Sequence, residues 1–179
     1  GSNDNYRIAL GNGDGTFTIN VITWDAPPTG GWWYAGRGKD SADFDKDGCM
    51  DFVSADSSNN LIFWKGDCTG SFTPTIVANT PYTNTYGVTA GDFDNDGDYD
   101  LVTGNGSGGL LYYFEFYNNG TLSTKGKPLS SIASSSYIMD IATEDFNNDG
   151  NLDFVVGGNN NYYYLFTGYG NGSFVKSTI

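Results

Sequence analysis

The sequence lacks histidine altogether, and it has only two cysteines and few basic residues. It also contains no apolar run approaching the ~20 residues that a membrane-spanning helix needs. With 8 Lys and Arg against 21 Asp and Glu, the formal net charge is −13. Nucleic-acid binding and binding to an anionic membrane are therefore not expected, because both need a clustered basic surface. Transition-metal sites are disfavoured as well, since their usual ligands are histidine and cysteine.

The residues that are abundant favour β structure. The chain has 13 Tyr, 12 Phe, 4 Trp and 26 Gly, and no long stretch shows the helical spacing of apolar residues. More than half of the acidic residues are concentrated in three short segments, 43–51, 92–100 and 145–153. The negative charge therefore reflects local chemistry in these segments.

The three acidic segments are copies of one motif. They read "ADFDKDGCMDFVSAD", "GDFDNDGDYDLVTGN" and "EDFNNDGNLDFVVGG", and their first aspartates, Asp43, Asp92 and Asp145, are 49 and 53 residues apart. About 30 residues after each comes a Gly-rich or Asn-rich turn that ends in an apolar residue. A fourth copy of that turn, "GNGDGTF", lies near the start of the chain without an aspartate loop before it.

Each repeat contains four strand candidates, which we call a, b, c and d. In the second repeat they span residues 86–90, 99–103, 110–117 and 122–125, with the aspartate loop between a and b. Four antiparallel strands per 40–50 residues are typical of a β-propeller blade, and the fixed period favours this all-β fold over a sandwich of meandering strands.

About three and a half blades are present in a single, partial β-propeller domain. We expect a c–d hairpin of an incomplete blade in residues 1–25, and blades in residues 26–78, 79–130 and 131–179. Such a chain is either a fragment of a longer array, which we favour, or completes its ring with another copy as a homo-oligomer.

The Asp-x-Asp-x-Asp-Gly loops are typical of calcium sites, because alternate side chains point inward and the glycine permits a sharp turn. An EF-hand would need a glutamate at position 12 and flanking helices, whereas position 12 is Ser54, Thr103 or Val156 and strand residues follow. Magnesium prefers fewer carboxylates and more water. We therefore predict about three structural Ca²⁺ ions, with metal binding coupled to folding.

The predicted ligands are the side chains at loop positions 1, 3, 5 and 9 and the carbonyl group at position 7. They are Asp43, Asp45, Asp47, Cys49 and Asp51 in the first loop, Asp92, Asp94, Asp96, Asp98 and Asp100 in the second, and Asp145, Asn147, Asp149, Asn151 and Asp153 in the third. Asp98 is expected to offer only its carbonyl oxygen, with its carboxylate facing water. The third loop is expected to bind most weakly, because Asn147 replaces a carboxylate.

The motif "GDFDNDGDYDLVTGN" resembles the FG-GAP/VCBS-type repeat of the integrin alpha-subunit propeller and of many secreted bacterial and fungal proteins. The resemblance implies a propeller with Ca²⁺ in a–b loops on one face. In such a blade the a–b and c–d loops emerge at the same end, so Cys49 and Cys68 could form a disulfide, with two buried free thiols as the alternative. A disulfide would fit a secreted or cell-surface protein.

Ligand sites on propellers commonly use the face opposite the calcium loops, where the d–a connections lie. The ligand-binding candidates there are Trp32, Trp33, Tyr34, Tyr86 and Tyr137. Aromatic rings beside Asn, Asp and Ser suit a carbohydrate ligand, as in a lectin, although packing between blades is an equally good explanation for the tryptophan cluster.

Catalysis is not expected, because most carboxylates belong to the metal loops and no nucleophile has a plausible base. The alternatives to a glycan-binding module are an integrin-like adhesion module for an extracellular protein ligand and a spacer. A further alternative is part of a secreted polysaccharide-active enzyme with its catalytic residues elsewhere.

Overall fold

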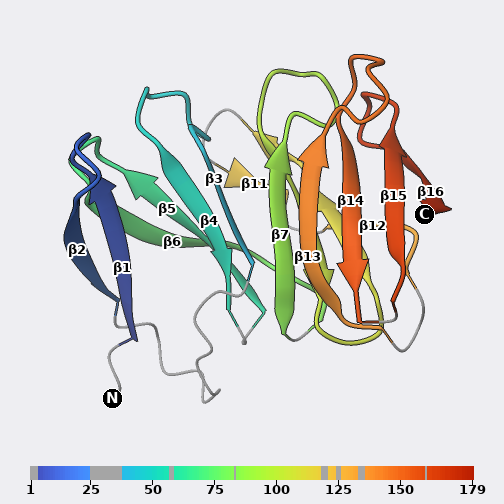
Figure 1. Cartoon of the computed structure of the whole chain (residues 1–179), viewed down its shortest axis with the longest axis horizontal. Coiled ribbons are helices and arrows are strands. Elements are labelled where there is room, and N and C mark those ends of the chain that lie inside the picture. The colour runs from blue at the N-terminus through green and yellow to red at the C-terminus, as the bar shows by residue number, and fades with distance from the viewer. Residues whose placement is uncertain are drawn as a thin grey trace.

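The computed structural model describes residues 4–24, 38–56, 59–82, 84–117, 121–123, 126–132, 136–159 and 161–179. These residues form sixteen strands and no helix, so none of their segments is a candidate for a membrane-spanning helix. Three four-stranded antiparallel sheets stand face to face in a row, with a two-stranded hairpin at one end (Figure 1). The prediction of an all-β fold built from four-stranded antiparallel units is confirmed.

The first and third sheets are simple meanders, and we call them blade 1 and blade 3. Blade 1 consists of β3 (Lys39–Ala42), β4 (Asp51–Ala55), β5 (Asn60–Gly66) and β6 (Phe72–Asn79). Blade 3 consists of β13 (Ile138–Glu144), β14 (Asp153–Gly158), β15 (Tyr163–Gly168) and β16 (Phe174–Thr178). In both, chain order equals strand order, as expected for strands a to d.

The middle sheet, blade 2, has an interrupted outer part. Its strands are β7 (Thr85–Gly91), β8 (Asp100–Asn105), β9 (Leu111–Phe114) and β12 (Lys127–Pro128), while β10 (Phe116–Tyr117) and β11 (Thr121–Leu122) form a separate pair. The expectation of continuous strands over 110–117 and 122–125 is wrong. The interruption falls at Glu115, whose backbone N–H donates to the Ser123 hydroxyl oxygen (3.1 Å) and whose carbonyl oxygen accepts the Ser123 N–H (2.7 Å).

The hairpin at the N-terminal end pairs β1 (Asp4–Gly11) with β2 (Phe17–Trp24) over their whole length. One of its faces lies against blade 1, where the Asn20 side-chain amide donates to the carbonyl oxygen of Gly70 in the β5–β6 turn (3.2 Å). In the described residues, the hairpin pairs with no inner strands of its own.

The apolar core lies between the sheets and forms two clusters. One joins blades 1 and 2 around Phe44, Phe63 and Phe116, and the other joins blades 2 and 3 around Phe93 and Phe154. Because blade 2 is covered on both faces, every residue of β8 is buried.

Polar contacts also tie the inner strands of neighbouring blades together. The Asp40 carboxylate on β3 accepts the Ala90 N–H on β7 (2.9 Å), and the hydroxyl groups of Thr89 on β7 and Thr143 on β13 are 2.8 Å apart. The innermost strands of the three blades are therefore neighbours in space, and the row of sheets does not close on itself within the described residues.

Candidate metal centres

The three aspartate loops join β3 to β4, β7 to β8 and β13 to β14, and they lie along one edge of the row, at the top of Figure 1. They share one backbone conformation. The glycine at position 6 has a φ of 89° in Gly48 and of 90° in Gly97 and Gly150, a region that residues with a Cβ rarely adopt. The sequence pattern therefore builds three equivalent turns that direct their side chains inward.

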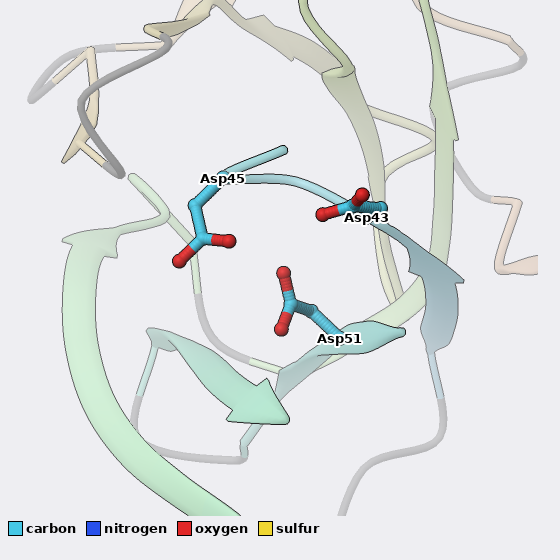
Figure 2. A group of neighbouring side chains, drawn as sticks. All are labelled: Asp43, Asp45 and Asp51. Atoms are coloured by element: carbon cyan, nitrogen blue, oxygen red, sulfur yellow. The ribbon is translucent and has the colours of Figure 1, made fainter. Parts of the chain in front are cut away.

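In the first loop, three carboxylates converge. The ligand oxygens of Asp43, Asp45 and Asp51 lie within 4.8 Å of one another, and Figure 2 shows these side chains turned toward a common space. Backbone N–H groups hold the arrangement, because the Asp43 carboxylate accepts those of Asp47 (3.1 Å) and Gly48 (3.0 Å). Burial raises the pKa of Asp51, as expected for a carboxylate removed from water.

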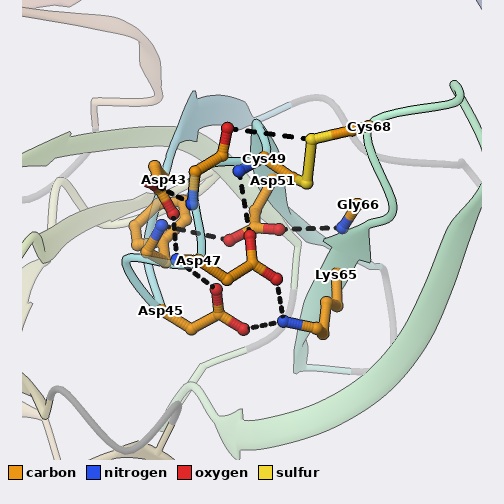
Figure 3. A network of polar contacts seen from close by, with 10 residues as sticks. Asp43, Asp45, Asp47, Cys49, Asp51, Lys65, Gly66 and Cys68 are labelled. Atoms are coloured by element: carbon orange, nitrogen blue, oxygen red, sulfur yellow. Dashed lines mark hydrogen bonds and ion pairs between the residues drawn. A yellow bond between two sulfur atoms is a disulfide. The ribbon is translucent and has the colours of Figure 1, made fainter.

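A lysine lies over this first loop, which the sequence analysis missed. The Lys65 ammonium group at the end of β5 forms ion pairs with both Asp45 and Asp47 (Figure 3). The hydrogen bonds to Asp45 and Asp47 raise the pKa of Lys65, and the hydrogen bond from Lys65 lowers the pKa of Asp47. Asp47, a predicted ligand, thus faces an ammonium group, and the carboxylate group described above does not include it.

The same loop is linked to the neighbouring turn by a disulfide. Cys49 at position 7 and Cys68 in the β5–β6 turn are bonded, with a sulfur–sulfur distance of 2.03 Å (Figure 3). Among the described residues, no cysteine is free. The bond connects the end of the aspartate loop to the turn between strands c and d of the same blade.

In the second loop, Asp92, Asp94 and Asp96 bring ligand oxygens within 4.8 Å of one another. One carboxylate oxygen, Oδ1 of Asp92, is buried and has no hydrogen-bond partner. Burying a carboxylate oxygen without a partner is costly, so this atom is suited to a cation. Burial also raises the pKa of the Asp94 carboxyl group. Hard oxygen donors without imidazole or thiolate fit Ca²⁺.

The ninth residue of this loop, Asp100, is not part of that group of three, but the Tyr113 hydroxyl group lies within hydrogen-bond distance of both Asp100 and Asp94. The Asp100 carboxylate accepts hydrogen bonds from the Tyr113 hydroxyl group (2.8 Å) and from the backbone N–H groups of Phe116 (3.1 Å) and Phe93 (3.3 Å). Burial nevertheless raises the pKa of Asp100 to about 7, because desolvation outweighs these hydrogen bonds. A cation nearby would favour the ionised form.

The third loop has the same backbone but no comparable group of three acidic ligands, although all of its residues are described. The Asn147 amide group donates to Asp149 Oδ2 (2.9 Å), while Asp149 Oδ1 accepts the Asn151 N–H (2.8 Å). These hydrogen bonds, that from Asn151 first, lower the pKa of Asp149. The prediction that this loop binds calcium most weakly stays a prediction.

The ninth aspartate has a second role that the sequence analysis missed. Asp51 and Asp153 are fully buried, and each accepts a backbone N–H from position 2 of its own loop and another from the end of strand c. In blade 1 the donors are Phe44 (3.1 Å) and Gly66 (2.8 Å). In blade 3, Phe146 and Gly168 make the same pair of bonds. The ninth aspartate therefore ties the loop to the sheet whether or not it also binds an ion.

The position-7 side chains connect neighbouring loops. Asp98 is only 6% exposed and forms an ion pair with Lys46 of the first loop, so the expectation that its carboxylate faces water is wrong. Asn151 accepts a hydrogen bond from Asn95 of the second loop (3.0 Å). In both cases position 4 of one loop reaches position 7 of the next, a contact between blades that no single repeat could reveal.

The structure describes two of the five aromatic residues predicted to bind a ligand, Tyr86 and Tyr137. Trp32, Trp33 and Tyr34 lie outside the described residues. Tyr86 is half-buried against the backbone of Gly106, whereas the Tyr137 side chain is exposed just before β13. Tyr137 lies at the end of blade 3 opposite the aspartate loops, since β13 runs from there toward the third loop.

Comparison with known protein families identifies the repeat. The model of the FG-GAP-like repeat matches residues 43–103 and 92–156, which include all three aspartate loops. This chain belongs to the FG-GAP repeat family. A comparison with curated proteins gives no match.

Solved structures show what fold this FG-GAP chain shares. An Agrocybe aegerita lectin, described as recognising non-reducing terminal N-acetylglucosamine, matches with a TM-score of 0.64 at 16% identity over 97% of this chain and 46% of that one. BBS1N in complex with ARL6DN, soaked with mercury, matches with a TM-score of 0.50 at 16% identity over 81% of this chain and 44% of that one. The FG-GAP chain thus spans less than half the length of either structure, and its fold is that of a partial β-propeller.

Proposed function

We propose that this FG-GAP protein is a calcium-stabilised propeller module, secreted or displayed at the cell surface, that binds carbohydrate and is not itself an enzyme. The observation that carries the calcium part is the state of Asp92. Its buried Oδ1 has no hydrogen-bond partner, and the carboxylates of Asp94 and Asp96 lie next to it. Two loops each hold a group of three carboxylates, and the third loop has the same backbone conformation. We therefore propose up to three bound ions.

The residues that would hold the ions are the loop side chains already described. In the first loop these are Asp43, Asp45 and Asp51, and in the second Asp92, Asp94 and Asp96. A bound Ca²⁺ would supply positive charge that offsets the repulsion among the carboxylates. The role is structural, because the carboxylates come from a short loop that encloses its own site.

Calcium titration tests this part of the proposal. We expect Ca²⁺ to raise the melting temperature strongly, Mg²⁺ to do so weakly, and EDTA to lower it. Asp92→Asn should reduce calcium affinity measured by calorimetry. Asp14→Asn is the matched control, because Asp14 is an exposed aspartate in the β1–β2 turn, outside the three loops. Equal melting curves in Ca²⁺ and EDTA would refute calcium stabilisation.

The carbohydrate part rests on tyrosines at the end of blade 3 opposite the aspartate loops. Tyr137, Tyr162 and Tyr163 are exposed there, and the Asn159 amide oxygen in the same connection accepts the Tyr137 N–H (2.8 Å). Exposed rings can stack on the C–H faces of a sugar, and neighbouring amide and backbone groups can bind its hydroxyl groups. A related fold in a lectin that recognises terminal N-acetylglucosamine supports this choice of ligand class.

A glycan array that includes terminal N-acetylglucosamine tests the assignment. Tyr163→Ala should reduce binding, and so should Tyr137→Ala and the double substitution of Trp32 and Trp33. Tyr169→Ala is the matched control, because Tyr169 is 59% exposed against 60% for Tyr163 but lies in the β15–β16 turn at the aspartate-loop end. No binding to any glycan, or equal losses for Tyr163 and Tyr169, would reject a carbohydrate site at this end.

The disulfide supports the extracellular assignment, because disulfides persist in oxidising compartments. Titration of free thiols in the unreduced, denatured protein should detect none. Two free thiols per chain would remove this support.

A further inference from the structure

The aromatic residue at loop position 2 makes a repeated contact between blades. Phe44 and Phe93 follow the first aspartate of their loops, and both rings are buried in the next blade. The Phe93 ring centroid lies 5.5 Å from that of Phe174 at the start of strand d in blade 3. Phe44 is packed likewise against Phe116 of blade 2, at 5.2 Å. The side chain at position 2 of each of these two loops therefore packs against the following blade.

The third copy of this residue, Phe146, is exposed. Its backbone is held as in the other loops, by a hydrogen bond from its N–H to Asp153 (3.1 Å), yet 47% of the residue is accessible against 1% for Phe93. The adjoining face of blade 3 is apolar too. Val175 is exposed on β16, on the opposite side of the strand from Phe174, which packs toward blade 2.

The complementary half of the contact is exposed at the other end of the chain. Phe17 starts β2 after the turn "GNGDGTF", which matches the turn "GYGNGSF" before Phe174. Phe17 is 64% exposed, and Ile19 and Val21 are exposed on the same face of β2. The opposite face carries Asn20, which is bonded to blade 1.

We propose that these two faces bind each other between two copies of this chain. Phe146 and Val175 of one copy pack against Phe17, Ile19 and Val21 of the other, and the contact repeats the Phe93–Phe174 packing. A second copy is the fitting occupant because the element that buries Phe93 is a c–d hairpin with phenylalanine at the start of strand d. The chain itself presents one such hairpin with that face uncovered.

The contact is head-to-tail, so each copy uses two different faces. A pair of copies can make the contact twice, once at each end, and so close on itself around a two-fold axis. Two apolar faces would be removed from water in this way, and contiguous exposed apolar surface commonly marks an interaction site. The inference does not depend on the proposed function, since no residue of the tyrosine end takes part.

Sedimentation analysis of the full chain tests the proposal by complementation. The wild type should be a dimer, and Phe17→Asp and Phe146→Asp should each be monomers. An equimolar mixture of the two variants should recover dimers, because one copy contributes an intact Phe146 face and the other an intact Phe17 face. Ile19→Asp and Val175→Asp provide a second pair with the same expected pattern if either phenylalanine variant fails to fold.

Leu110→Asp is the matched control, because Leu110 is exposed in blade 2 between the two end faces. It should leave the dimer intact. A monomeric wild type, a dimer unaffected by both aspartate substitutions, or a mixture that stays monomeric would each overturn the proposal.

Discussion

Replacing Asp153 separates two roles of the ninth loop position, ion ligand and backbone acceptor. The buried carboxylate accepts the N–H of Phe146 through Oδ2 (3.1 Å) and that of Gly168 through Oδ1 (2.9 Å). Asparagine keeps one acceptor and turns its own N–H₂ group toward the other backbone N–H, whereas alanine removes both acceptors. A buried donor left unsatisfied costs about 1–3 kcal/mol. Asp153→Asn should therefore lower the free energy of unfolding by about 1–3 kcal/mol, and Asp153→Ala by about 2–6 kcal/mol.

The measurement is thermal and urea unfolding in EDTA, which removes calcium, so that no bound ion contributes to stability. For a chain of this size, 1 kcal/mol corresponds to about 2–4 °C in melting temperature, so Asp153→Asn should melt about 2–12 °C below the wild type. Asp149→Asn is the control, since Asp149 is an exposed residue whose carboxylate accepts hydrogen bonds from Asn147 and Asn151 of its own loop. It should reduce the stabilisation by calcium but leave the EDTA melting curve nearly unchanged.

The reasoning fails if Asp153→Asn unfolds like the wild type in EDTA and loses only its response to calcium. That result would make the ninth aspartate an ion ligand alone. The opposite result is a loss of stability in EDTA with the calcium response retained. It would show that the ninth aspartate acts only as an acceptor for backbone N–H groups.

Four further variants have definite expected outcomes. Replacing Cys49 and Cys68 with serine should lower the free energy of unfolding by about 3 kcal/mol, because the disulfide closes a loop between residues 19 apart, and denaturant unfolding without reductant measures this. Lys65→Thr should raise the calcium affinity of the first loop in calorimetry, since the ammonium group no longer competes for the carboxylates. Thr167 is next to last in β15, as Lys65 is in β5, so Thr167→Lys should lower the calcium affinity of the third loop. Gly168→Ala should destabilise blade 3 severely, because its Cβ would lie 2.1 Å from a backbone carbonyl oxygen; a wild-type melting temperature would contradict this.

The sequence predicted the repeat units well because their signals are local. Alternating aspartates, the position-6 glycine and the turn before strand d all act within a few residues, so the period located three loops and the four-stranded sheets around them. The irregular outer part of blade 2 was missed because it depends on how Ser123 meets Glu115 across a turn.

The metal centres were predictable in position but not in detail. Which carboxylates converge depends on residues from other strands and other blades. Lys65 reaches the first loop from β5, and Lys46 crosses from one loop to bury Asp98 in the next. Spacing along the chain carries no information about these contacts, since they arise only when the sheets stack.

Position 2 of each loop couples the ion sites to the packing of the blades. The N–H of Phe93 is bonded to Asp100 of its own loop, while its ring is packed against Phe154 and Phe174 of the next blade. A change that reorganises the loop must therefore move this ring within the core between blades. Removing calcium should accordingly increase amide hydrogen exchange in β14, in the following blade, as well as in the second loop. Faster exchange confined to the loops would show that the loops and the core between blades are energetically independent.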